Sequence, residues 1–268
     1  MMKRTEARRE PLKKAGSWAA GALAAAVLLC AVSAVYVSGT RSAEVLARKR
    51  ELPVYGVERG DNRIAISFDA AWGGDKTKKI LDTLDEYGVK ATFFLVDIWT
   101  QRFPGLVKEI AAQGHEIGNH STSHPHMSAL SRDKIASELE TMSANVEKLI
   151  GVRPTLFRPP YGDYNNDVVL TARQKGYEVI QWSVDSLDWK NKGVQPLIDR
   201  ATKNVKSGDI VLFHNDSQYI VDALPVILKR YREQGLLPGP VSQVLLPGET
   251  SIDPQGIQHP AATTVPEV

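Results

Sequence analysis

A regular alternation of apolar runs and amphipathic segments between residues 62 and 246 constrains the fold of this 268-residue chain more than any other feature. Residues 64–69 are apolar up to a terminal carboxylate, whereas residues 76–87 repeat apolar side chains at the helical period and end before Gly88. Strands that alternate with helices about seven times are typical of a parallel sheet, so the pattern predicts an α/β domain. The further strands are predicted at residues 91–96, 114–118, 155–158, 178–185 and 209–214, and the further helices at 103–113, 131–150, 168–175, 194–205 and 221–234, with a short element at 241–246.

The N-terminal region predicts a membrane anchor. Residues 1–14 carry six Lys or Arg side chains, and residues 17–38 contain no charge at all. An uncharged run of this length is sufficient to cross a bilayer as a helix, which takes about 20 residues. Basic residues before the run favour a cytoplasmic N-terminus, so we expect a single-pass protein of the cell membrane with its body outside the cytoplasm. Cleavage after small residues near Ala34 or Gly39 is the alternative, and it gives a secreted protein.

These features divide the chain into five expected parts. They are a cytoplasmic basic segment at residues 1–16, a transmembrane anchor at 17–38, a linker at 39–61, the α/β domain at 62–246 and a disordered tail at 247–268. A formal charge of +2 is too small to indicate a nucleic-acid-binding protein. Two glycines, Gly73 and Gly74, do not make up the glycine-rich motif of a nucleotide-binding site. A single cysteine, Cys30, excludes an internal disulfide bond.

Three of the six histidines fall within seven residues, at positions 120, 124 and 126. His120 and His124 are four residues apart, and on a helical turn that spacing places both imidazoles on one face, where they can share a cation. Taken alone, such a pair is more often found on a surface or at a helix cap. The pair follows a predicted strand, however, and polar residues also end the other strands. At the carboxyl ends of the predicted strands lie Asp69, His120, Arg158, Asp185 and His214.

Five segments in a fixed order resemble the polysaccharide deacetylases of carbohydrate esterase family 4, the NodB-homology proteins. The resemblance covers about residues 62–246. The expected anchor and the run at residues 66–73 are most similar to the deacetylases of spore-forming bacteria, which suggests a role in sporulation. The five segments are residues 67–69 (SFD), 120–124 (HSTSH), 158–162 (RPPYG), 185–189 (DSLDW) and 212–214 (LFH).

The resemblance implies a distorted (β/α) barrel of about seven strands that removes acetyl groups from N-acetylated sugars with the help of a divalent metal. Zinc is the usual metal, with cobalt or manganese as alternatives. Asp69 would be the general base, held ionised by Arg158, and His214 would be the acid, oriented by Asp188. The implied metal ligands are His120 and His124, and the implied substrate pocket is formed by Tyr161, Trp189 and Leu212.

The chain departs from the family pattern at Ala70, where most members have a second aspartate that binds the metal. A metal site without this anionic ligand binds a divalent cation less tightly. Three outcomes remain open: Asp75 supplies the third ligand, two histidines and water hold the metal loosely, or the protein binds glycan without catalysis. Since the other catalytic positions are intact, we expect an active enzyme. Its expected substrate is peptidoglycan, which lies within reach of a membrane-anchored domain.

Simpler interpretations of single residues also stay open at this stage. A helix cap is a less favoured alternative for Asp69, and a structural ion pair is one for Arg158 and Asp188, whereas Trp189 is equally compatible with the core. A third class of chemistry, glycoside hydrolysis by Asp69 with Asp185 or Asp188, would not require the histidine pair.

Overall fold

The computed structural model describes residues 50–261. The predicted cytoplasmic segment and anchor, and the linker up to residue 49, lie outside these residues. None of the helices within residues 50–261 is long and apolar enough to cross a membrane. The compact unit begins at Glu51, about ten residues before the predicted start of the domain.

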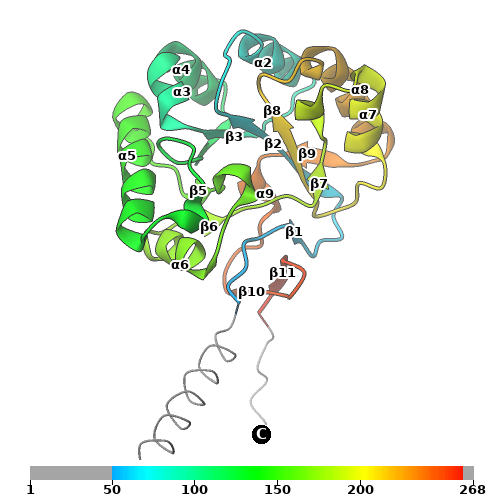
Figure 1. Cartoon of the computed structure of the whole chain (residues 1–268). Helices are drawn as coiled ribbons and strands as arrows, with labels where there is room; N and C mark the ends of the chain where they lie inside the picture. The colour runs from blue at the N-terminus through cyan, green and yellow to red at the C-terminus, as the bar shows by residue number, and fades with distance from the viewer. Residues whose placement is uncertain (1–49, 262–268) are drawn as a thin grey trace, which may run out of the picture. The chain divides into compact units, whose positions relative to one another are not determined.

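The centre of the domain is a curled sheet of eight parallel strands, which confirms the predicted α/β class (Figure 1). The strands follow the order β6-β5-β4-β3-β2-β8-β7, and β9 pairs with the first residues of β2. Their bounds are β2 (Arg63–Ala70), β3 (Thr92–Leu95), β4 (Glu116–Asn119), β5 (Leu156–Phe157), β6 (Glu178–Val179), β7 (Val184–Asp185), β8 (Ile210–His214) and β9 (Leu237–Gly239).

Helices surround the sheet on its outside (Figure 1). The side chain of Ser131 accepts a hydrogen bond from the backbone N–H of Lys134 and so caps the longest helix. The helices are α2 (Thr77–Glu86), α3 (Asp97–Arg102), α4 (Pro104–Ala112), α5 (Arg132–Ile150), α6 (Asn166–Gln174), α7 (Val194–Thr202), α8 (Ile220–Glu233) and α9 (Val241–Val244), with short 3-10 turns η1 (Met127–Ala129), η2 (Pro160–Gly162) and η3 (Asp188–Lys190).

The predicted strand at residues 178–185 is two short strands in the structure, one at each edge of the sheet. Its first residues, β6, pair with β5, and its last residues, β7, pair with β8. Between them, the backbone N–H of Gln181 donates to Val54 and that of Ser183 donates to Ile210. One continuous segment, residues 178–185, therefore connects the two edges of the sheet. The barrel is distorted because this segment, and not a full-length strand, closes it.

The core lies between the curled sheet and its surrounding helices. Phe68 on the central strand β2 stacks on Phe93 with ring centroids 5.0 Å apart and on Phe213 at 5.5 Å. These three rings belong to the neighbouring strands β3, β2 and β8, so they tie together the part of the sheet that carries Asp69 and His214 at its carboxyl end. The packed aromatic layer gives the strand ends a rigid base.

The predicted disordered tail is wrong for most of its length. Strands β10 (Thr250–Ile252) and β11 (Ile257–Pro260) form a three-stranded sheet with β1 (Gly56–Val57), which itself lies in the predicted linker. Polar contacts supplement apolar burial here. The side chain of Gln258 is 4% exposed and accepts the backbone N–H of Leu246, and His259 contacts the carboxylates of Glu58 and Asp253. Composition alone does not reveal strands that are held by such contacts.

Deleting residues 248–268 should lower the melting temperature because it removes the partners of β1. We expect a loss of at least about 1 kcal/mol, or about 2–4 °C for a domain of this size. Deleting only residues 262–268 is the matched control and should leave the melting temperature unchanged. Thermal unfolding followed by circular dichroism measures both. Equal melting temperatures for the two truncated proteins would contradict a stabilising role for β10 and β11.

Candidate active site

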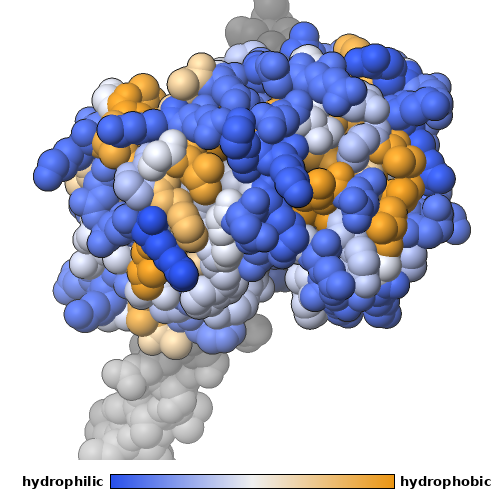
Figure 2. Space-filling view, turned by 90° about the horizontal axis from the view of Figure 1, so that it is seen from above, coloured by the Kyte–Doolittle hydropathy of each residue, from blue (hydrophilic) through white to orange (hydrophobic). Residues whose placement is uncertain are grey.

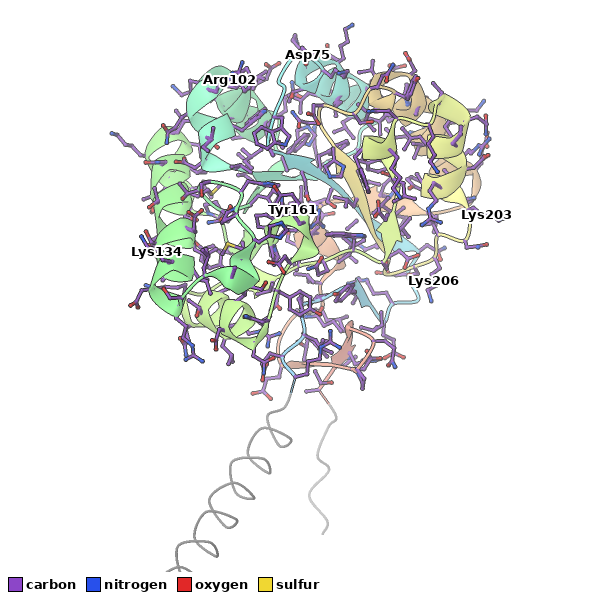
Figure 3. The ribbon with its side chains drawn as sticks, viewed as in Figure 1. Asp75, Arg102, Lys134, Tyr161, Lys203 and Lys206 are labelled. Atoms are coloured by element: carbon purple, nitrogen blue, oxygen red, sulfur yellow. The ribbon has the colours of Figure 1, made fainter. Side chains whose placement is uncertain are left out.

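A cavity of about 610 Å³ lies at the carboxyl ends of the strands and brings most of the predicted site residues together. Arg158 and Asp188 lie beside it and contact Asp69 and His214, respectively. Tyr161 projects over the middle of the domain in Figure 3, whereas Asp75 lies at its edge. The cavity is lined by the predicted residues Asp69, His120, His124, Tyr161, Asp185, Trp189, Leu212 and His214, and also by Ala71, Trp72, Trp182, Asn191, Asp216 and Ser217.

Asp69 and Arg158 form a buried ion pair beneath the cavity. Arg158 is fully buried and donates from Nη1 to Asp69 Oδ1 at 2.8 Å and from Nη2 to the carbonyl of Gln181 at 3.0 Å. Its guanidinium carbon lies 4.1 Å from the centre of the Phe94 ring. Burial opposes the charge of Asp69, but Arg158, together with the nearby His120 and His214, outweighs burial and holds the pKa of that carboxyl below its usual range. Asp69 is therefore an ionised carboxylate, and it is not a helix cap.

His120 is oriented for binding a cation. Its Nδ1 lies 2.7 Å from the carbonyl oxygen of Arg158, and because a carbonyl only accepts, Nδ1 carries the proton. The unprotonated Nε2 then faces Asp69 Oδ2 at 3.5 Å. Burial lowers the pKa of His120, against the opposing charge of Asp69, so the ring is neutral. A neutral imidazole with its second nitrogen bonded to a carbonyl is the usual form of a metal ligand.

His124 approaches His120 through a loop and not through a helical turn. Ser121 and His124 have φ angles of 71° and 58°, in the left-handed region. The two imidazole centroids nevertheless lie 5.0 Å apart. Burial is the main cause that lowers the pKa of His124, to about 4, so this ring is also neutral at physiological pH. The two side chains meet as predicted, by a different backbone path.

Two residues that sequence reasoning missed hold this loop. The Glu138 carboxylate on α5 accepts the backbone N–H groups of Thr122 and Ser123 at 2.9 and 2.8 Å, and the Asn119 side chain accepts that of Ser121 at 2.8 Å. Asn119 adjoins the histidine motif and could have been found by its position. Glu138 lies on a helix 15 residues beyond Ser123, and no local pattern marks it. These bonds stabilise the left-handed loop conformation that brings His124 to His120.

His214 and Asp188 form the second charged pair of the site. Asp188 Oδ1 lies 2.7 Å from His214 Nδ1, and Asp188 Oδ2 accepts the backbone N–H of His214 at 2.7 Å. Burial disfavours the charged ring, but the hydrogen bond and charge of Asp188 prevail and raise the pKa of His214 to about 8. The ring is thus protonated near neutral pH. The alternative of a structural Arg158–Asp188 pair is wrong, because each of these residues pairs with a different partner.

Tyr161 and Trp189 stand at the mouth of the cavity and are 59% and 53% exposed, so the interpretation of Trp189 as a core residue is wrong. Tyr161 has a left-handed φ of 60°. Its ring packs 4.5 Å from His124 and stacks on His126, also at 4.5 Å between centroids. His126, for which the sequence indicated no ligand role, lies 3.7 Å from Asp163 Oδ2 and so links the histidine loop to the loop that carries Tyr161.

The donor set fits a divalent cation only in part. His120 and His124 offer two neutral nitrogens, but Ala70 is fully buried and has no donor atom. Asp75, the predicted third ligand, is three-quarters exposed, lies 3.6 Å from Lys76 and does not line the cavity. Within residues 50–261, no group of three or more His, Cys, Asp or Glu side chains is arranged to hold a metal. The residues present therefore fit a weak site of two histidines.

Replacing Asp188 by Asn should lower the pKa of His214 from about 8, because the interactions of Asp188 are the largest that oppose burial and only the smaller effects of Asp69 and Asp216 then remain. In the native protein the raised pKa means that protonated His214 stabilises the fold fully below pH 6.5, and that this contribution is lost as the pH rises through 8. Titration of the imidazole NMR signals measures the shift. Asp185→Asn is the control and should leave the pKa in place; an unchanged pKa in Asp188→Asn would refute the pairing.

Comparisons with known proteins agree with this geometry. The family model "Polysaccharide deacetylase" matches residues 56–180. A peptidoglycan-N-acetylglucosamine deacetylase of Bacillus cereus is 40% identical over 194 residues, which cover 70% of this chain and 91% of that protein. The crystal structure of a CE4 family pseudoenzyme from Bacillus anthracis aligns with a TM-score of 0.70 at 31% identity over 72% of this chain and 68% of that one. A mutant of it with restored enzymatic activity aligns with a TM-score of 0.70 at 32% identity, over 72% and 70%. The chain belongs to the polysaccharide deacetylase family, carbohydrate esterase family 4.

Proposed function

We propose that this protein is a metal-dependent hydrolase that removes N-acetyl groups from the sugars of peptidoglycan. One observation carries the proposal: an ionised carboxylate and a protonated imidazole face the same cavity from adjacent strands. Asp69 and His214 are directly paired positions of β2 and β8. Each is held in its charge state by its own buried partner, Arg158 or Asp188. A base and an acid with pKa values moved apart are what hydrolysis of an amide requires.

The proposed reaction adds water across the carbonyl of the acetamido group. Asp69 accepts a proton from the attacking water as its oxygen bonds to the carbonyl carbon. His214 then donates a proton from its ring to the amide nitrogen, the C–N bond breaks, and acetate and a free amine leave. A divalent cation, expected to be zinc with cobalt or manganese as alternatives, would be held by His120 and His124 and would polarise the carbonyl and lower the pKa of water.

The relatives and the expected anchor support peptidoglycan as the substrate. The Bacillus cereus relative is a peptidoglycan-N-acetylglucosamine deacetylase. A protein anchored by residues 17–38 would hold residues 51–268 beside the cell wall, outside the cytoplasmic membrane. Glycoside hydrolysis by Asp69 with Asp188 is less compatible with the site, because Asp188 is engaged twice by His214.

A second candidate function is glycan binding without catalysis, and Ala70 favours it. The family position for an anionic metal ligand holds a methyl group here, and the structure brings no other carboxylate of residues 50–261 into a three-ligand group with the histidines. The similar Bacillus anthracis protein is a pseudoenzyme of which a mutant has restored activity. Introducing a carboxylate at position 70 of this chain therefore offers a test that separates the two candidates.

Acetate release from peptidoglycan and from N-acetylglucosamine oligomers decides between them. The full chain is stripped of metal and reloaded with zinc, cobalt or manganese. We expect release by the native protein, and a loss of about 100- to 10,000-fold in Asp69→Asn, which keeps the side-chain shape but removes the base. Ala70→Asp should raise the affinity for metal.

Two outcomes separate the candidates. Release that does not depend on Asp69 would overturn the proposed mechanism. If only Ala70→Asp releases acetate while the native chain binds glycan, the second candidate is correct. Circular dichroism of each variant shows whether it is folded.

A further inference from the structure

Three aromatic side chains at the surface of the domain all belong to one cavity. Among the described residues, the large exposed apolar side chains include the aromatic residues Trp72, Tyr161 and Trp189, which are 62%, 59% and 53% exposed. All three line the candidate active site. The remaining exposed apolar residues are aliphatic and come from separate elements, and the face in Figure 2 shows apolar residues in separate patches. Exposed aromatic rings are therefore concentrated where substrate would bind.

Trp72 is the member of this group to which the family pattern gives no role. It lies in the loop between β2 and α2, which is held without help from the indole. The carbonyl of Gly73 accepts hydrogen bonds from Trp99 Nε1 at 2.9 Å and from Asn215 Nδ2 at 2.6 Å. The preceding residue, Ala71, packs against the core. A rigid loop thus presents a large aromatic face to solvent, which is unfavourable for the free protein and favours a binding role.

The position of Trp72 relative to the chemistry defines what it would contact. Its ring centre lies 6.0 Å from that of His124, beside the histidine pair. Tyr161 follows β5 and Trp189 follows β7, whereas Trp72 follows β2, which lies between these two strands in the sheet. Trp189 and Leu212 are the implied contacts of the acetyl group. Trp72 therefore lies next to the space for the reacting sugar and not within the acetyl pocket.

We propose that Trp72 stacks on the pyranose ring of the sugar adjacent to the one that is deacetylated, so that the ligand is an oligosaccharide of N-acetylhexosamines and not a single sugar. This inference rests on the proposed function of the same cavity. One face of a pyranose presents C–H groups that pack on an aromatic ring, while its hydroxyl groups stay in water, and a ring that remains largely exposed suits such a ligand. The cavity volume, about 610 Å³, lies within the range of about 300–1,000 Å³ that is typical of ligand sites.

The test measures binding of N-acetylglucosamine oligomers of one to six units to the full chain, by titration calorimetry on metal-free protein, so that it does not depend on catalysis. We expect the affinity of the native protein to rise with oligomer length. Trp72→Leu and Trp72→Ala should weaken binding of the tetramer roughly tenfold, as expected for removing a central aromatic contact, and leave binding of the single sugar unchanged. Trp72→Phe should retain most of the affinity because it keeps an aromatic face. Ile98→Ala, at an exposed apolar residue outside the cavity, is the control and should have no effect.

Failure of this inference is distinguishable from failure of the proposed function. If Trp72→Leu binds the tetramer as the native protein does while Trp189→Ala does not, the subsite is absent and the proposed function stands. If the Trp72 variants lose the dependence of affinity on oligomer length but the native chain releases no acetate, the sugar subsite is supported and the proposed catalytic function is rejected. Equal weakening of the single sugar and of the tetramer in Trp72→Leu would assign Trp72 to the reacting sugar and overturn a subsite for the adjacent sugar. No binding of any oligomer to the native chain would overturn both.

Discussion

The buried ion pair between Asp69 and Arg158 is the interaction on which the site depends. Removing two charges from water is costly, and one good hydrogen bond at 2.8 Å recovers only part of that cost. The pair is also connected to the rest of the site. The carbonyl of Arg158 fixes the proton of His120, and its guanidinium bonds to Gln181 on the segment that closes the barrel. One residue thus influences the charge of Asp69, the tautomer of His120 and the position of the closing segment.

Under the proposed function, the site has both of its proton-transfer groups but lacks a carboxylate among its metal donors. Asp69 and His214 have partners that hold them in opposite charge states, whereas the histidine pair has lost the anion that most family members place at position 70. Two neutral imidazoles bind a dication less tightly than a set that includes a carboxylate, because charge neutralisation is missing. The buried methyl of Ala70 thus weakens the metal site without disturbing the strand that carries Asp69. The same structure is therefore compatible with an enzyme of weak metal affinity and with a glycan-binding relative.

The positions of the functional residues could be predicted from the sequence because the carboxyl ends of parallel strands meet at one edge of a sheet. Asp69, His120, Arg158 and His214 each end a strand, and the structure brings all four together. The details depended on contacts between distant residues. The carboxylate of Glu138, on helix α5, accepts hydrogen bonds from the loop that carries His124. Asp75 lies at the surface, so it does not join the two histidines. Polar composition also concealed β10 and β11, because Gln258 and His259 are held there by hydrogen bonds and charge.

The central claim is that His120 and His124 alone supply the protein ligands of the metal. Cobalt substitution followed by X-ray absorption spectroscopy measures it directly, because imidazole nitrogens give a scattering pattern different from that of carboxylate oxygens. Two imidazoles per cobalt, with the remaining positions filled by water, is the predicted result, and His120→Ala or His124→Ala should remove one imidazole and most of the affinity. A carboxylate ligand from the protein, or a spectrum unchanged in both histidine variants, would contradict the account.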